Sequence, residues 1–120
     1  MIILVVEDES AIHKLLQLTL RSLAVDIVFA YTVSDALQAL EKITPDLIIV
    51  DIHLPIHSGW ELLEIIRSKP RLDHLPVVIL TAHATLVNQQ KAHAMGVQHV
   101  LIKPVLPDVL RQTLTKTLNP

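Results

Sequence analysis

The fold is decided by one stretch in the middle of the chain, Leu47-Ile48-Ile49-Val50-Asp51-Ile52-His53-Leu54-Pro55. Its first four residues are all apolar, which is typical of a strand buried on both faces in a parallel sheet covered by helices. Asp51 follows this run directly, and Pro55 marks a turn four residues later. Because open α/β sheets bind ligands at the carboxyl ends of their strands, the sequence predicts that Asp51 is the working residue.

Length and composition indicate one small domain with an aliphatic core. The chain has 120 residues, of which 51% are hydrophobic, but it holds only one Phe, one Tyr and one Trp. The formal charge is −2, with no basic patch for nucleic acid and few aromatic rings on which bases could stack. There is no cysteine, which excludes a disulfide framework and thiolate chemistry.

The apolar runs carry no export or membrane signal. The opening run, Met1 to Val6, reaches acidic residues at once and lacks the basic flank and cleavage site of a signal peptide. No apolar run is long enough to span a bilayer. We therefore expect one cytoplasmic domain over residues 1–120.

Short apolar runs alternate with helical patterns five times. The expected strands cover residues 2–6, 25–30, 46–51, 77–80 and 98–102. Strands that alternate with helices at this spacing predict an α/β fold, a doubly wound five-stranded parallel sheet with five helices and right-handed crossovers.

Periodicity and capping residues place the five helices. In the first helix, which starts at Ser10, we expect Ala11, Leu15 and Leu18 to face the core. Capping spacings begin the second helix over residues 32–35 and the third over residues 58–61. The fourth helix, residues 84–95, has the poorest apolar stripe and ends before a capping glycine. The fifth helix has a proline near its first turn and leucines at a spacing of four.

Polar residues follow four of the five expected strands. Glu7 and Asp8 follow the first strand, Asp51 the third, Thr81 the fourth and Lys103 the fifth. In a doubly wound sheet these strand ends share one edge, so we expect the five side chains to converge.

The convergence of these groups favours phosphoryl chemistry. Three neighbouring carboxylates need a cation, and oxygen ligands alone suit Mg²⁺. Lys103 supplies a fixed positive charge and Thr81 a hydroxyl donor, so the set suits a phosphoryl group that Asp51 accepts as an acyl phosphate. Taken singly, each residue would more often be a solvated acid, a helix cap or a surface charge. Their joint placement is what favours a site.

The same motifs, in this order and spacing, resemble those of response-regulator receiver domains over essentially the whole chain. The matching pieces are Ile3-Leu-Val-Val-Glu-Asp8, Asp46-Leu-Ile-Ile-Val-Asp51, Leu54-Pro55 followed by Gly59, Val77-Val-Ile-Leu-Thr-Ala82, Ala94-Met-Gly96 and Lys103-Pro104. The resemblance implies a flavodoxin-like, receiver-type fold and a signalling domain of a His-Asp phosphorelay. Such a domain is no enzyme beyond catalysing its own phosphorylation and slow autodephosphorylation.

The resemblance also assigns roles to residues. It implies that Asp51 accepts phosphate from a histidine kinase or a histidine phosphotransfer protein, and that Thr81 and Lys103 bind the phosphoryl oxygens. It implies Mg²⁺ held by Asp8, Asp51 and the backbone carbonyl of His53, with Glu7 acting partly through water. The Lys103–Pro104 bond is expected to be cis. Downstream, an effector or a second copy would bind the surface from the fourth helix to the fifth.

Two features depart from the family's pattern or are particular to this chain. Val100 stands where members often carry the Tyr or Phe of an aromatic switch, so that switch is missing or replaced. His53 and His83 lie two residues past Asp51 and Thr81, and we hypothesise that they flank the phosphate entrance. Four further histidines are expected to be surface or edge residues: His13, His74, His93 and His99.

Two other functions stay open. One is a receiver-like module that binds partners without being phosphorylated, which the valine at position 100 allows. The other is an aspartyl-phosphate phosphatase, which would need a second acid near the nucleophile, where this chain has His53. A nucleotide-binding loop is excluded because the chain has only two glycines.

Overall fold

The computed structural model describes residues 1–97 and 99–119 and has five strands that alternate with five helices. The elements are β1 (Ile2–Val6), α1 (Ser10–Leu20), β2 (Asp26–Ala30), α2 (Val33–Lys42), β3 (Leu47–Asp51), α3 (Gly59–Ser68), β4 (Val77–Thr81), α4 (Leu86–Ala94), β5 (His99–Ile102) and α5 (Pro107–Leu118). Gln98, the predicted first residue of the fifth strand, lies outside the described residues.

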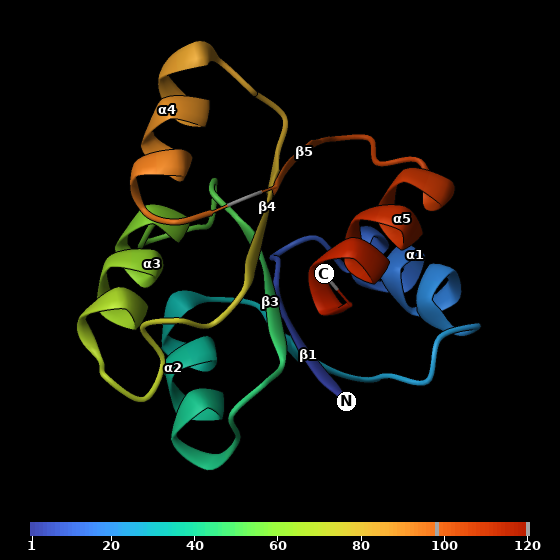
Figure 1. The fold of residues 1–120 in the computed structure, drawn as a ribbon, viewed down its shortest axis with the longest axis horizontal. Helices are drawn as coiled ribbons and strands as arrows, with labels where there is room; N and C mark the ends of the chain where they lie inside the picture. Colours follow the sequence, from blue (N-terminus) through green and yellow to red (C-terminus); the bar gives the residue numbers. More distant parts are fainter. Residues whose placement is uncertain (98, 120) are drawn as a thin grey trace.

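The five strands form one parallel sheet in the order β2-β1-β3-β4-β5. Figure 1 shows the helices on both faces of this sheet, with α2, α3 and α4 on one side and α1 and α5 on the other. The predicted doubly wound fold is therefore confirmed, and the central strand is the one that the sequence placed there.

The core has two aliphatic layers, one on each face of the sheet. Every residue of β3 is buried: Ile48 and Val50 pack toward α2 and α3, whereas Leu47 and Ile49 pack toward α1 and α5. Trp60 and Phe29 contribute only at the margins of these layers. The continuous apolar run of β3 thus reflects burial on both faces, as its sequence predicts.

Helix α1 corrects one prediction. Its buried residues are His13, Leu16, Thr19 and Leu20, while Leu18, expected in the core, is 52% exposed. Apolar residues crowd this helix, so two overlapping stripes are available, and hydrophobicity alone favours the one without the histidine. The expected core face and the expected surface position of His13 were both wrong.

Side-chain caps fix the beginning of three helices. Thr32 Oγ1 accepts a hydrogen bond from the backbone N–H of Asp35, and Ser58 Oγ accepts one from Glu61, as their spacing predicts. Thr85 caps α4 in the same way. Gly96 ends α4 with a φ of 76°, a left-handed conformation that glycine adopts without strain.

Helix α4 is the most weakly packed helix, as its sequence predicts. Ala92 is its only buried residue among those described. The ammonium group of Lys91 lies 4.8 Å from the centroid of the Trp60 ring on α3, and Arg67 Nε donates a hydrogen bond to the carbonyl of Met95. The first turn makes little apolar contact with the rest of the protein, because Leu86 is 70% and Val87 is 71% exposed.

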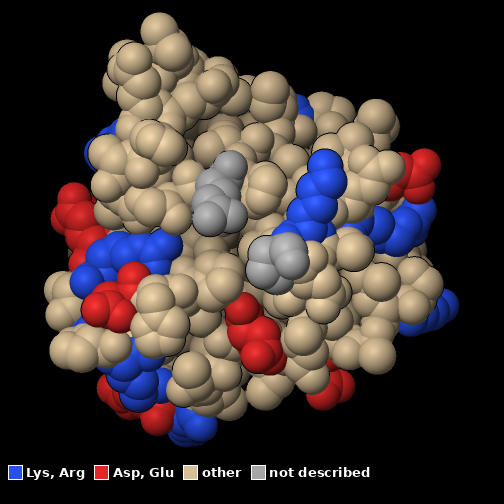
Figure 2. Space-filling view, viewed as in Figure 1, with Lys and Arg blue, Asp and Glu red and all other residues tan. Residues whose placement is uncertain are grey.

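Charged residues are dispersed over the surface. On the face shown in Figure 2, basic and acidic side chains are interspersed, with no large area of one sign. Within the described residues, no helix is both long and apolar enough to cross a membrane.

The loop from β3 to α3 packs directly against the end of β3. The backbone N–H of Gly59 donates to the carbonyl of Ile52 at 2.9 Å. A Cβ atom on Gly59 would lie 2.4 Å from the carbonyl oxygen of Asp51. In the same loop, Ile56 has a φ of 70° and is 88% exposed.

We predict that Gly59→Ala destabilises the protein by about 1–3 kcal/mol, because the added methyl group meets backbone rather than a flexible side chain. Urea unfolding measures the change. Ser68→Ala, at the far end of the same helix, is the control. Equal stability of Gly59→Ala and the wild type would contradict the close approach.

We predict that Ile56→Asn raises the free energy of unfolding by about 1 kcal/mol, since a β-branched residue is strained at positive φ and asparagine tolerates that conformation. The exposed side chain leaves no cavity when it is replaced. Ile56→Val keeps the β-branch and should leave the thermal midpoint unchanged. A midpoint for Ile56→Asn at or below that of Ile56→Val would disprove the strain.

Candidate functional site

The ends of four strands place the predicted site residues along one edge of the sheet. Glu7 follows β1, Asp51 ends β3, Thr81 ends β4 and Lys103 follows β5. The parallel register pairs Asp51 with Leu80 and Thr81 with Ile102, so neighbouring strands end almost level. The topology therefore brings together groups that lie far apart in the sequence.

Lys103 lies at the centre of the cluster. Its ammonium nitrogen is 2.9 Å from Glu7 Oε2 and 3.1 Å from Asp51 Oδ2. A third carboxylate, Glu9 Oε1, is 3.5 Å away at the exposed rim. Because the Glu7 and Asp51 side chains are buried, the lysine offsets charges that water does not screen.

Glu7, Asp8 and Asp51 form an acidic pocket. One oxygen from each carboxylate lies within 4.8 Å of the others, a spacing that fits a shared cation. Glu7 and Asp51 are buried, whereas Asp8 is exposed, so the pocket opens to solvent on the Asp8 side. The other Glu7 oxygen, Oε1, accepts a hydrogen bond from the backbone N–H of Glu9 at 3.2 Å.

Burial and charge shift two pKa values in this pocket. Burial, against the lowering effect of the hydrogen bond to Lys103 and with a smaller contribution from the charge of Asp51, raises the pKa of Glu7 to about 7. Burial acts to lower the pKa of Lys103, but its bonds to Glu7 and Asp51 outweigh this, so the pKa is raised. Lys103 therefore stays protonated, while Glu7 titrates near neutrality.

Thr81 is fully buried at the same edge, and its hydroxyl bonds to the loop that follows. Thr81 Oγ1 accepts from the backbone N–H of His83 at 3.0 Å and donates to the carbonyl of the same residue at 3.3 Å. The backbone N–H of His53 donates to Asp51 Oδ1 at 3.0 Å. The rings of His53 and His83 lie edge to face with centroids 5.5 Å apart, so the two side chains contact each other.

Two residues at the site were not predicted. His13 is buried and donates from Nε2 to the backbone carbonyl of Glu7, with its ring 4.4 Å from Phe29 and 4.6 Å from Tyr31 between centroids. Glu9 reaches Lys103 from the loop after β1. Glu9 follows Glu7 and Asp8 directly, so the run of three acids was an available signal, whereas His13 had none.

The peptide bond after Lys103 and the side chain of Val100 can both be compared with the sequence predictions. The Lys103–Pro104 peptide bond is cis, as predicted. Val100 is half-buried and packs against the core layer on the α2 and α3 side, so an aliphatic side chain fills the position of an aromatic switch.

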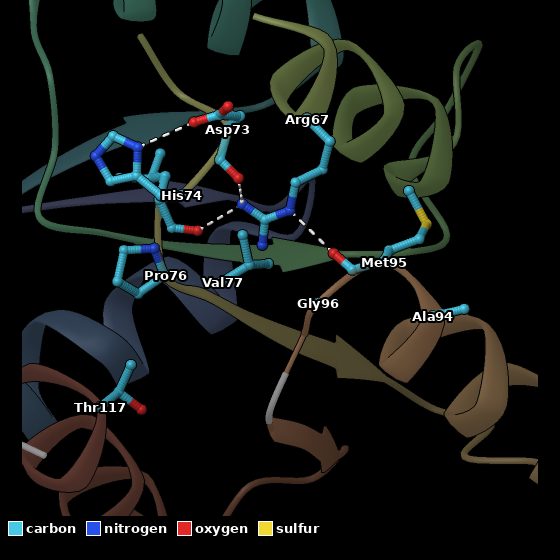
Figure 3. Close-up of a pocket in the computed structure, with 10 residues that line it drawn as sticks. Arg67, Asp73, His74, Pro76, Val77, Ala94, Met95, Gly96 and Thr117 are labelled. Carbon is cyan, nitrogen blue, oxygen red and sulfur yellow. Dashed lines mark hydrogen bonds and ion pairs between the residues drawn. The ribbon is translucent and has the colours of Figure 1, made fainter. Parts of the chain in front are cut away.

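A surface cavity of about 560 Å³ lies at the opposite edge of the sheet, where β4 begins at Val77 and α5 ends near Thr117. Figure 3 shows Arg67 reaching across it, with hydrogen bonds to the backbone carbonyls of Met95, Asp73 and Leu75. Burial lowers the pKa of Arg67, and nearby Asp73 partly opposes this. Arg67 ties α3 to the end of α4 and has no part in the acidic pocket.

Comparison with known proteins identifies the fold and the family. The response regulator receiver domain matches residues 3–115 of this chain. The chain is 43% identical over 103 residues to the Regulator of RpoS of Escherichia coli (strain K12). The aligned region covers 86% of this chain and 30% of that protein. The chain thus spans less than a third of the length of the curated relatives named first among its matches.

Two solved structures are also similar. The chemotaxis response regulator CheY4 of Vibrio cholerae superposes with a TM-score of 0.90 at 27% identity, over 98% of each chain. The receiver domain of the sensor histidine kinase PA1611 from Pseudomonas aeruginosa PAO1 has a TM-score of 0.88 at 25% identity, over 99% of this chain and 98% of that one. That structure has a magnesium ion coordinated in its active site cleft.

The family match, the order of the strands and the acidic pocket all agree with the resemblance seen in the sequence. The chain belongs to the response regulator receiver domains, which are modules of two-component signalling and not enzymes.

Proposed function

We propose that residues 1–120 form one phospho-acceptor domain in which Asp51 receives a phosphoryl group from a phosphohistidine. The observation that carries this proposal is the environment of Asp51. Its carboxylate ends a fully buried strand, lies 3.1 Å from Lys103 Nζ and shares a pocket with Glu7 and Asp8. A buried carboxylate beside one lysine and two further acids has no evident structural purpose, because burying like charges costs free energy.

The transfer itself is a displacement at phosphorus. An oxygen of the Asp51 carboxylate forms the new O–P bond, and the N–P bond of the donor breaks with its electron pair going to the imidazole nitrogen. Lys103 holds the Asp51 carboxylate in place and offsets charge on the incoming phosphoryl oxygens. We propose that Thr81 donates its hydroxyl hydrogen to another of these oxygens.

The residues of the pocket fit a divalent cation. Three carboxylates share the pocket, and one ammonium group contacts two of them, so the cluster carries excess negative charge, and all its ligand atoms are oxygens. We propose that Asp8, Asp51, the backbone carbonyl of His53 and, partly through water, Glu7 hold Mg²⁺. When bound, this ion would neutralise charge on the phosphoryl oxygens.

The proposed partners lie on two sides of the reaction. Upstream, a histidine kinase or a histidine phosphotransfer protein supplies the phosphoryl group. We propose that this transfer takes place in the cytoplasm. Downstream, an effector or a second copy binds the surface from α4 to α5. This surface has exposed apolar side chains on three adjacent elements: Leu86, Val87, Ile102, Leu106 and Val109.

We predict that acetyl phosphate with Mg²⁺ adds one phosphate to the intact protein, measured by mass spectrometry over a time course short enough to catch a labile adduct. EDTA should abolish the gain, and so should Asp51→Asn, which keeps the shape of the side chain but removes the nucleophile. Asp46→Asn, directly before the same strand, is the matched control and should gain the phosphate normally.

A folded wild type that binds Mg²⁺ but gains no mass would reject phosphorylation and favour the module that binds partners without it. A gain that persists in Asp51→Asn would place the acceptor elsewhere.

We predict that the stability of the metal-free protein falls as pH rises from about 4.5 to about 7, because the folded state holds the proton of Glu7 that the unfolded state has lost. Mg²⁺ should restore stability at pH 7 to 8 by binding only the folded state. Thermal midpoints with EDTA and with Mg²⁺ test this. Glu7→Gln should flatten the slope between pH 5 and 7, and an unchanged slope in that variant would contradict the assignment.

A further inference from the structure

Thr81 and helix α4 share one hydrogen-bond acceptor. The carbonyl oxygen of His83 accepts from Thr81 Oγ1 at 3.3 Å and from Asn88 Nδ2 at 2.9 Å. Asn88 is the third residue of α4, and its backbone N–H donates to the capping hydroxyl of Thr85 at 3.1 Å. A single carbonyl therefore connects the end of β4 with the first turn of α4.

The neighbouring side chain makes a similar contact without this connection. Gln89 Nε2 donates to the carbonyl of Ala84 at 3.0 Å. Within the described residues, no hydrogen bond joins the Ala84 carbonyl to Thr81. Both side chains donate to a carbonyl of the preceding loop, but only the acceptor of Asn88 also accepts a hydrogen bond from Thr81.

We propose that Asn88 is the positioning residue through which α4 responds to the state of Thr81. The proposal rests on the function proposed above. When a phosphoryl group on Asp51 takes the hydroxyl hydrogen of Thr81, the His83 carbonyl loses one of its two donors. Asn88 keeps its hold on that carbonyl, so the first turn of α4 moves with the loop.

The weak packing of α4 keeps the free-energy cost of this movement low. Its first turn exposes Leu86 and Val87 and is not buried against the sheet, whereas its second half is anchored by Ala92 and by the bond from Arg67 to Met95. Local motion costs least where few apolar contacts break.

The first test needs no phosphate. Asn88→Asp removes the donor and introduces a carboxylate at the third helical position, where the helix dipole favours a negative charge. A double-mutant cycle combines it with Thr81→Val and measures amide hydrogen exchange over residues 84–90. Because both side chains serve one carbonyl, the combined effect on exchange should differ from the product of the single effects by at least about threefold. Gln89→Glu, which adds the same charge one residue on, should combine with Thr81→Val without coupling.

The second test adds acetyl phosphate and Mg²⁺ at matched phosphate occupancy, checked by intact mass. Phosphorylation should change exchange over residues 84–90 in the wild type and in Gln89→Glu, and by less than half as much in Asn88→Asp. Asn88→Ala, which adds no charge, should behave like Asn88→Asp.

Independent effects in the first cycle, or an undiminished response in Asn88→Asp, would overturn the role of Asn88. A wild type that gains no phosphate would defeat the proposed function instead, and the first cycle would still decide whether Asn88 and Thr81 are coupled.

Discussion

The site depends on one interaction, the contact of the Lys103 ammonium group with the buried carboxylates of Glu7 and Asp51. Two like charges removed from water repel each other and lose their hydration, so neither is tolerated there without a positive partner. One lysine faces both and leaves an excess of negative charge, which the exposed Asp8 increases. Lys103 thus stabilises the pocket but leaves part of its negative charge uncompensated. Such a pocket suits the uptake of a cation and a phosphoryl group.

Much of this arrangement was predictable, because the signals that specify it are local. An apolar run with an acid at its end identifies β3, and capping residues mark the starts of α2 and α3. The parallel topology then determines that residues after different strands meet at one edge. Glu7, Asp8, Asp51 and Lys103 converge for that reason, and Thr81 lies at the same edge.

The rotation of α1 was not predictable in the same way. Its sequence carries two apolar stripes, and which one faces the core depends on what the neighbouring strand offers. Phe29 and Tyr31 lie against the ring of His13, and the carbonyl of Glu7 accepts a hydrogen bond from Nε2, so one of the two ring nitrogens has a partner inside the protein. Hydrophobicity ranks residues one at a time and cannot register such partners.

The contact between Lys91 and Trp60 has an optical consequence. Trp60 is the only tryptophan of the chain and follows Gly59, which packs against the backbone of Asp51. The charged ammonium group of Lys91, on α4, also lies over its ring. Indole emission responds to a charge close to the ring, so the intrinsic fluorescence of the unlabelled protein reports on the separation of α3 and α4, next to the pocket, at a single position.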